Sequence, residues 1–520
     1  MAGAFMRAVT LFWTLLLVGA GSAHAQGFRV DETSIREIHR AMREQGLTAR
    51  LLVEHYLARI EAYDKQGPAL NAVIAINARA LERADSLDAH YARTGEFVGP
   101  LHGIPIIVKD NYDTHDMPTT AGSRSLQASV PPDDAYQVRK LREAGAIVLA
   151  KSNMAEFAFS PYETVGSALP GYTRNPYALN RVTAGSSGGT AAAVSANLGS
   201  VGLGTDTGNS IRGPSSHTSL VGIRSTMGLT SRDGIVPLYL DRDIGGPMAR
   251  TVEDAVIVFD LIAGHDAADP WSEPGRRAER YTDYLQGDRL RGARIGVVRQ
   301  LSNTETADPE VLQRFEEALD DLRAAGATVI DPVSIVELDT IEGSLWCRRF
   351  RHDLEAYLAS LGPDAPVTTL EEIIESGRFH PPIEQRLRFF QGFDQPPEED
   401  EGCREAATNT VTLRAGVRRV LEEHRLDALA YPSWNNPPRL IGDLTTPHGN
   451  NSYQLSPPTG FPAVTVPMGF VRGTLPVGLQ FLGDAWSEPT LIGLAYSYEQ
   501  ATRHRRPPAA TPPLGTIALP

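Results

Sequence analysis

Lysine is rare in this chain, and two of its lysines directly follow apolar runs. Of the 49 basic residues among 520, the lysines are Lys65, Lys109, Lys140 and Lys151. Lys109 follows residues 104–108 (IPIIV), and Lys151 follows residues 146–150 (AIVLA). A lysine in apolar surroundings can lose its proton, whereas arginine cannot, so both are candidate general bases. The alternatives for each are a position at the sheet edge, from which the ammonium reaches solvent, and an ion pair with a nearby carboxylate, Asp110 or Glu156.

A serine- and glycine-rich stretch, residues 184–189 (AGSSGG), precedes an alanine-rich segment that is expected to be helical. Its serines can simply cap that helix. It is not a phosphate-binding loop, because no Gly-Lys-Ser/Thr follows. It also fits Gly-x-Ser-x-Gly, which would make Ser187 the nucleophile of a His-dependent hydrolase. That motif requires a strand directly before it, and residues 176–183 make a poor strand.

A second serine, Ser210, lies in residues 204–212 (GTDTGNSIR), behind a short apolar run. Gly208 and Asn209 both tolerate left-handed backbone geometry, so consecutive N–H groups can converge on one point. Converging amides stabilise an oxyanion, and a serine beside them with a base in reach makes an acyl-transfer site. The alternative is a polar turn around a buried pair of Asp206 and Arg212.

Helices and strands that alternate along the chain must position these residues. Apolar spacing predicts helices at residues 35–42, 52–60, 138–144, 190–197, 310–325 and 352–361. Apolar runs predict buried strands at residues 104–108, 146–150, 463–468 and 475–481. Residues 160–230 show little periodicity and are expected to form functional loops. Such alternation predicts an α/β protein with a largely parallel sheet, in which ligands bind beyond the carboxyl ends of strands.

In combination, these stretches resemble the amidase signature family. The matches are residues 103–111, 185–189 and 204–212, supported by residues 118–123, 151–157 and 246–251, and the resemblance spans roughly residues 30–505. It implies one large α/β domain over residues 26–506, with a mixed, largely parallel central sheet covered by helices. Residues 507–520 would form a Pro-rich tail.

The resemblance also implies a catalytic mechanism, because enzymes of that family hydrolyse amides with a Ser–Ser–Lys triad. By motif, Ser210 is the nucleophile, Ser186 relays a proton and follows a cis peptide bond, and Lys109 is the base. Ser187 becomes a secondary residue that forms hydrogen bonds near the substrate. No cofactor or metal is implied, and the sequence contains no His-Glu-x-x-His or multi-cysteine zinc pattern.

The oxyanion would be held by backbone N–H groups of Thr207, Gly208, Asn209 and Ser210. The family usually has Gly-Gly before the nucleophile, whereas this chain has Gly208-Asn209. An asparagine tolerates the backbone geometry but adds a side chain beside the acyl site. The sequence therefore does not define which substrate shape the site accepts.

Residues 1–25 are typical of a secretory signal peptide. Arg7 precedes an apolar run, and residues 23–25 (AHA) have the small-x-small form of a cleavage site. The mature chain would begin near Gln26 and be periplasmic or secreted, with an uncleaved anchor as the alternative. In an oxidising compartment Cys347 and Cys403 could pair, although sequence alone does not place them within bonding distance.

The sequence therefore predicts an exported amidase that converts carboxylic or peptide amides to an acid and ammonia or an amine. Its expected partner is a small-molecule or peptide amide, and it is expected to act as a monomer or homodimer without a membrane span after cleavage. The net charge of −14 argues against nucleic-acid binding. Two alternatives remain: an amidotransferase component that hydrolyses glutamine for transamidation on transfer RNA, and the hydrolase that uses Ser187.

Overall fold

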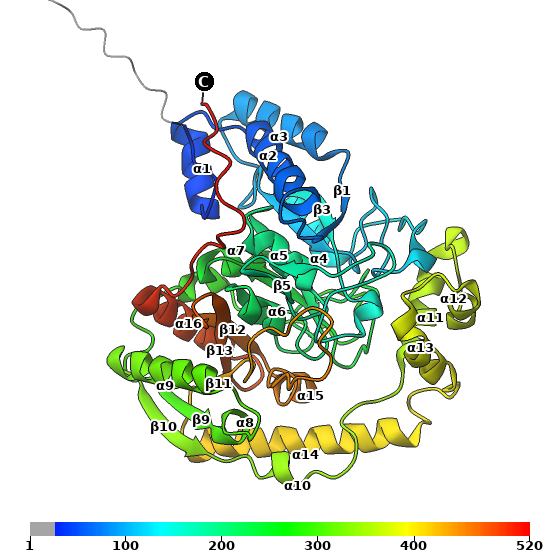
Figure 1. The fold of residues 1–520 in the computed structure, drawn as a ribbon, viewed down its shortest axis with the longest axis vertical. Helices are drawn as coiled ribbons and strands as arrows, with labels where there is room; N and C mark the ends of the chain where they lie inside the picture. The colour runs from blue at the N-terminus through cyan, green and yellow to red at the C-terminus, as the bar shows by residue number, and fades with distance from the viewer. Residues whose placement is uncertain (1–26, 520) are drawn as a thin grey trace, which may run out of the picture.

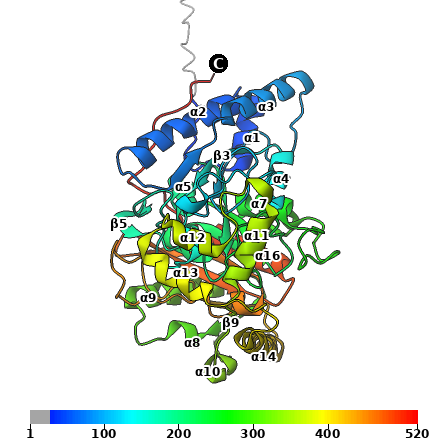
Figure 2. The same ribbon diagram turned by 90° about the vertical axis from the view of Figure 1, so that its right-hand side faces the viewer.

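An 11-stranded sheet forms the centre of the computed structural model, which describes residues 27–519. Helices pack over the sheet, and the described part of the chain begins and ends near α1 and α2 (Figures 1 and 2). In sheet order the strands are β1 (Val73–Ile76), β3 (Ile147–Ser152), β2 (Pro105–Lys109), β6 (Val201–Asp206), β8 (Ile244–Ala249), β7 (Val221–Arg224), β12 (Ala463–Val471), β13 (Leu475–Leu482), β11 (Ala428–Pro432), β9 (Arg294–Val298) and β10 (Thr328–Val333).

The sheet is mixed. Strands β3, β2 and β6 run parallel to one another, as do β11, β9 and β10. The strands between these two groups pair antiparallel, from β6 through β8, β7, β12 and β13 to β11. The predicted α/β class, with a mixed central sheet covered by helices, is confirmed.

The helices include all six of those predicted, with shifted boundaries. They are α1 (Ile35–Glu44), α2 (Ala49–Arg59), α3 (Ala80–Thr94), α4 (Tyr136–Glu143), α5 (Gly188–Ser195), α6 (Arg212–His217), α7 (Val252–Ile262), α8 (Arg299–Ser302), α9 (Pro309–Ala324), α10 (Glu337–Thr340), α11 (Phe350–Ser360), α12 (Leu370–Ser376), α13 (Glu384–Gln391), α14 (Glu401–Glu423), α15 (Ser456–Thr459) and α16 (Glu488–Thr502). Helix α1 begins with a capping box, in which Ser34 and Glu37 satisfy each other's backbone N–H groups.

Helices α11, α12 and α13 form a group at the side of the molecule (Figure 1). They share an apolar core with the loop after β3, in which Phe350 and Phe390 pack against Phe159 at ring-centroid distances of 4.7 and 5.8 Å. Aromatic pairs at such distances add to the free energy of burial. The helical group is thereby fixed to a loop that continues towards residues 184–189.

Two segments differ from the sequence-based expectation. Residues 176–183, expected to be a poor strand, contain β5 (Ala178–Val182), which pairs with β4 (Arg174–Asn175) in a separate two-stranded sheet. The 23-residue helix α14, which begins at Glu401, lies in a stretch for which the apolar spacing above predicts no helix.

The tail beyond Arg506 contains no helix within residues 507–519 and runs back over α2. The buried guanidinium of Arg59 donates to the carbonyl oxygens of Thr511 and Pro512, at 3.2 and 3.1 Å. Residues 1–25, the expected signal peptide, lie outside the described residues. Within residues 27–519, no helix has the length and apolar character needed to cross a bilayer.

Candidate active site

Lys109 is the last residue of β2 and is completely buried. Its Nζ lies 2.7 Å from Ser186 Oγ and 2.7 Å from Thr205 Oγ1. It forms no ion pair with any carboxylate of residues 27–519. Burial disfavours the ammonium and lowers the pKa of Lys109 to about 7, although the more distant Asp206 and Asp243 act in the opposite direction. The amine can therefore be neutral at physiological pH.

Lys151 ends up in a different environment, although it also follows a buried strand. Its Nζ lies 3.4 Å from Asp110 Oδ1 and donates to the carbonyl oxygen of Tyr112 at 2.7 Å. It also donates to Thr119 Oγ1 and the carbonyl oxygen of Pro118, at 2.9 and 3.2 Å. The ion pair considered for the two lysines therefore forms at Lys151, which anchors the loop after β2, and not at Lys109.

Ser186 and Ser187 lie directly before α5, and both are buried. The peptide bond between Gly185 and Ser186 is cis, as the resemblance implies. Ser187 Oγ donates to the carbonyl oxygen of Thr205 at 3.1 Å and accepts from the N–H of the same residue at 3.3 Å. Ser187 therefore ties the serine-rich stretch to β6, and no histidine of the described chain hydrogen-bonds to it.

Ser210 lies in the loop between β6 and α6. The carboxylate of Asp206, at the end of β6, accepts from Ile211 N at 3.1 Å and from Arg212 Nε at 3.0 Å, and Arg224 Nη1 lies 3.3 Å from it. The buried pair of Asp206 and Arg212 is thus present, and it shapes the loop that carries Ser210. The pair and the catalytic interpretation are compatible.

Four consecutive backbone N–H groups, those of residues 207–210, donate to no acceptor among the described residues. Thr207, Gly208, Asn209 and Ser210 all line one cavity of about 410 Å³. Buried N–H groups are normally paired, so a set left free beside a cavity can bind an oxygen that carries negative charge. The loop has the donors that an oxyanion requires.

The hydroxyls of Ser186 and Ser210 do not hydrogen-bond to each other in the part of the chain that the structure describes, although Ser187 N donates to Ser210 O at 3.3 Å. Hydrogen bonds connect Lys109 directly to Ser186 and Thr205, and Ser210 as a whole residue is 5% exposed. In the absence of substrate, hydrogen bonds that serve catalysis are often long and tighten only when substrate binds.

The remaining cavity wall comes from segments far away in the sequence. Its other lining residues are Ala158, Phe159, Pro161, Tyr162, Leu238, Trp346, Arg386, Phe389, Phe390, Asn450 and Tyr453. The wall is mainly aromatic and contains one cation, Arg386. Nothing in the spacing of residues 345–460 indicated that they line a site, because their aromatic residues are scattered along several helices and loops.

A second cavity of about 430 Å³ adjoins the first. Residues on the wall of both cavities are Phe159, Pro161, Tyr162, Arg386 and Phe389. A bound molecule that extends past this shared wall has space for several further groups.

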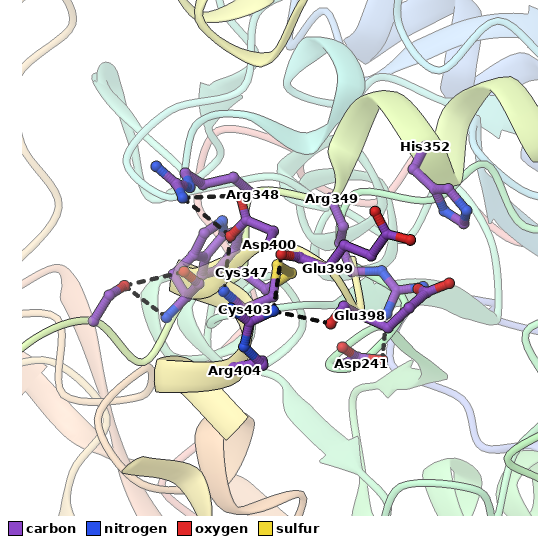
Figure 3. The surroundings of a disulfide bond; sticks show 12 residues. Asp241, Cys347, Arg348, Arg349, His352, Glu398, Glu399, Asp400, Cys403 and Arg404 are labelled. Carbon is purple, nitrogen blue, oxygen red and sulfur yellow. Dashed lines mark hydrogen bonds and ion pairs between the residues drawn. A yellow bond between two sulfur atoms is a disulfide. The ribbon is translucent and has the colours of Figure 1, made fainter. Parts of the chain in front are cut away.

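A disulfide joins Cys347 and Cys403 (Figure 3), and Cys347 directly follows Trp346 of the cavity wall. The disulfide connects the residue after Trp346 to the first turn of α14, where Arg348 Nη2 lies 2.9 Å from Asp400 Oδ2. The two cysteines therefore pair, which the sequence left open. The bond fixes the position of Trp346 relative to α14.

One group within residues 27–519 has side chains close enough to share a metal ion: His115, Asp116 and Asp134. Arg142 Nη2 lies 2.6 Å from Asp116, and Arg142 Nε lies 3.1 Å from Asp134. Since both carboxylates already pair with a cation, this group is an ion-pair cluster on the surface.

A sequence model of the Amidase family matches residues 51–492. The peptide amidase from Stenotrophomonas maltophilia has a TM-score of 0.84 and is 39% identical over 93% of this chain and 99% of that one. A probable amidase of Arabidopsis thaliana is 34% identical over 95% of each chain. A glutamyl-tRNA(Gln) amidotransferase component from Acinetobacter baumannii is 34% identical over 90% of this chain and 96% of that protein. The chain therefore belongs to the amidase signature family and is a hydrolase that acts on amide C–N bonds.

Proposed function

We propose that this protein is an exported amidase that hydrolyses peptide amides to an acid and ammonia through an acyl-enzyme on Ser210. The observation that carries the mechanism is the 2.7 Å contact between Lys109 Nζ and Ser186 Oγ. It lies in a buried site where no carboxylate of the described residues pairs with the lysine. Burial keeps the amine available as a base.

Acylation follows from one chain of proton transfers. Neutral Lys109 takes the proton of Ser186, Ser186 takes that of Ser210, and Ser210 Oγ bonds to the carbonyl carbon of the amide. The free N–H groups of residues 207–210 hold the oxygen as it becomes negative. The lysine proton then returns along the same path to the amide nitrogen, the C–N bond breaks, and ammonia leaves.

Deacylation uses the same groups with water as the nucleophile. Water gives a proton to the path that leads to Lys109, and its oxygen bonds to the ester carbon. The bond to Ser210 Oγ breaks, Ser210 regains a proton, and the acid is released. The mechanism requires no histidine, and none within residues 27–519 hydrogen-bonds to Lys109, Ser186 or Ser210. The buried His217 contacts the carbonyl oxygen of Asn436, and burial lowers its pKa to about 3.

Two features support a peptide amide as the substrate. The solved relative named a peptide amidase is 39% identical over nearly the whole chain. A second cavity also adjoins the aromatic cavity at Ser210 and shares Tyr162 and Arg386 with it, which fits a substrate with more than one residue on the acyl side.

Export is supported by residues 1–25, which have the charge, apolar run and cleavage site of a signal peptide. The disulfide between Cys347 and Cys403 is further support, because disulfides persist mainly in oxidising compartments. Mass analysis of protein released from the cytoplasm should find a chain that begins near Gln26. Released protein that retains Met1 would contradict cleavage.

The assignment of the nucleophile is tested with two neighbouring serines. Ser210→Ala should lower kcat on an amidated dipeptide by about 10⁴-fold or more, because the acyl-enzyme cannot form. Ser187→Ala is the matched control, since it removes only hydrogen bonds to Thr205, and it should keep most of the activity. If Ser187→Ala is inactive and Ser210→Ala is active, the assignment is wrong and the Ser187 hydrolase is favoured.

The amidotransferase alternative is tested with the same assay. The wild-type protein should release ammonia from an amidated dipeptide faster than from free glutamine, at equal concentrations. A strong preference for glutamine would instead favour a role in transamidation.

A further inference from the structure

Asn209 is buried at the place where the family usually has glycine, and its side chain links two other segments. Its Nδ2 donates to the carbonyl oxygen of Gly185 at 2.7 Å. Its Oδ1 accepts from Asn450 Nδ2 at 2.6 Å. Hydrogen bonds therefore connect Asn209 to both Gly185 and Asn450, although the two asparagines are 241 positions apart in the sequence.

The direction of these hydrogen bonds is fixed by chemistry. A carbonyl oxygen can only accept, so the amide nitrogen of Asn209 must face Gly185. The amide oxygen of Asn209 then faces Asn450, which must donate. The orientation of a side-chain amide is often ambiguous in proteins. Here the carbonyl oxygen of Gly185 determines it for both Asn209 and Asn450.

Each end of this chain of hydrogen bonds reaches part of the active site. Gly185 directly precedes Ser186, the residue in contact with Lys109. Asn450 lies three residues before Tyr453, and both line the cavity at Ser210. The segment around Asn450 is itself held firmly, because Asn451 Nδ2 donates to the carbonyl oxygen of Pro432 at 3.0 Å.

We propose that Asn209 is a positioning residue, whose amide holds Ser186 in line between Lys109 and Ser210 and couples this alignment to the cavity wall at Asn450. The inference rests on the proposed function, since it assigns the relay to Ser186. A glycine at position 209 would leave the carbonyl of Gly185 and the amide of Asn450 without these partners. Misplacement of a reacting group by about 1 Å can cost about 100-fold in rate.

Asn209→Asp tests the alignment with almost no change in shape. A carboxylate oxygen then faces the carbonyl oxygen of Gly185, and two acceptors repel each other. We expect kcat on an amidated dipeptide to fall by about tenfold or more while KM stays within about threefold. The rate at which a fluorophosphonate labels Ser210 should fall by a similar factor, because labelling needs the same activated hydroxyl.

The matched control is Asn175→Asp. Asn175 is also buried, and its Nδ2 donates to the carbonyl oxygens of His217 and Val182, at 2.9 and 3.2 Å. It lies on β4 and does not line either cavity. This variant should lower the melting temperature but leave the labelling rate and kcat of the folded protein unchanged.

Asn450→Ala separates the two halves of the proposal. It removes the donor to Asn209 but leaves the bond between Asn209 and Gly185, so KM should rise with a smaller loss of kcat than in Asn209→Asp. Unchanged kcat and labelling in Asn209→Asp would overturn the inference, as would equal slowing in Asn175→Asp. If the wild-type protein hydrolyses no peptide amide, the proposed function is wrong. The labelling rates of the wild type and Asn209→Asp still decide, in that case, whether Asn209 positions the serines.

Discussion

The rate of amide hydrolysis should depend on pH through the protonation of Lys109. Complete burial lowers the pKa of this lysine from 10.5 to about 7, against the smaller opposing effects of Asp206 and Asp243. Only the neutral amine can take the proton of Ser186. Activity is therefore present above about pH 7 and is lost as the pH falls through that value.

The size of the effect follows from the pKa. With a value of about 7, about one tenth of the molecules carry neutral Lys109 at pH 6 and about nine tenths at pH 8. The value of kcat/KM should thus rise about tenfold between pH 6 and pH 8 and change about tenfold per pH unit below pH 6. A lysine with an ordinary pKa of about 10.4 would instead give a rate that keeps rising to about pH 10.

The assay is the initial rate of ammonia release from an amidated dipeptide between pH 5 and pH 10. Lys109→Met should lose about 1,000-fold or more and show no rise near pH 7. The control is Lys140→Met, because Lys140 lies on the surface of α4 and pairs with Glu143 at 3.4 Å; its profile should match the wild type. A rise near pH 7 that survives in Lys109→Met, or a wild-type rise centred near pH 10, would refute the assignment of Lys109 as the base.

Three further predictions concern stability. Lys109→Met should be more stable than the wild type at pH 7 by about 4 kcal/mol, because the unfolded lysine binds a proton that the folded one largely excludes, and each of about three pKa units is worth about 1.4 kcal/mol. The gap should close as the pH rises towards 10.5, and a less stable variant would contradict this. Replacing Cys347 and Cys403 by serine should cost about 4 kcal/mol for a loop of 56 residues, measured by denaturant unfolding, and a cost below about 1 kcal/mol would show that the bond is dispensable. Asp206→Asn should cost about 3–5 kcal/mol in the same measurement, since two buried arginines lose their carboxylate, and a near-neutral change would contradict the importance of that pair.

The fold class could be predicted, and a triad could be proposed, because the information is local in sequence. Apolar runs mark β2 and β3, and the stretches around Lys109, Ser186 and Ser210 match a family pattern at consistent spacing. Apart from the family pattern, the apolar runs alone could not tell Lys109 from Lys151, because both lysines follow buried runs. Their different neighbours, a serine for one and a carboxylate for the other, come together only in three dimensions.

The lining of the cavity at Ser210 could not be predicted, for the same reason. Trp346, Arg386 and Asn450 each belong to a different segment, and no local period or motif connects them with Ser210. Asn209 could be recognised as a departure from the family pattern, but its partner Asn450 lies 241 residues away. The pairing of the two cysteines likewise depends on how α14 packs against the loop before α11.

An antiparallel backbone pair joins the first and last segments of the described chain. Phe28 N donates to Ile517 O at 2.9 Å, and Ile517 N donates to Phe28 O at 2.8 Å. Because the pair is antiparallel, a force that pulls the two ends apart would load these two hydrogen bonds in turn and break them one after the other, as in unzipping. The same closeness makes the protein suitable for circular permutation, because a short linker could join residues 28 and 517 while new ends are opened in an exposed loop.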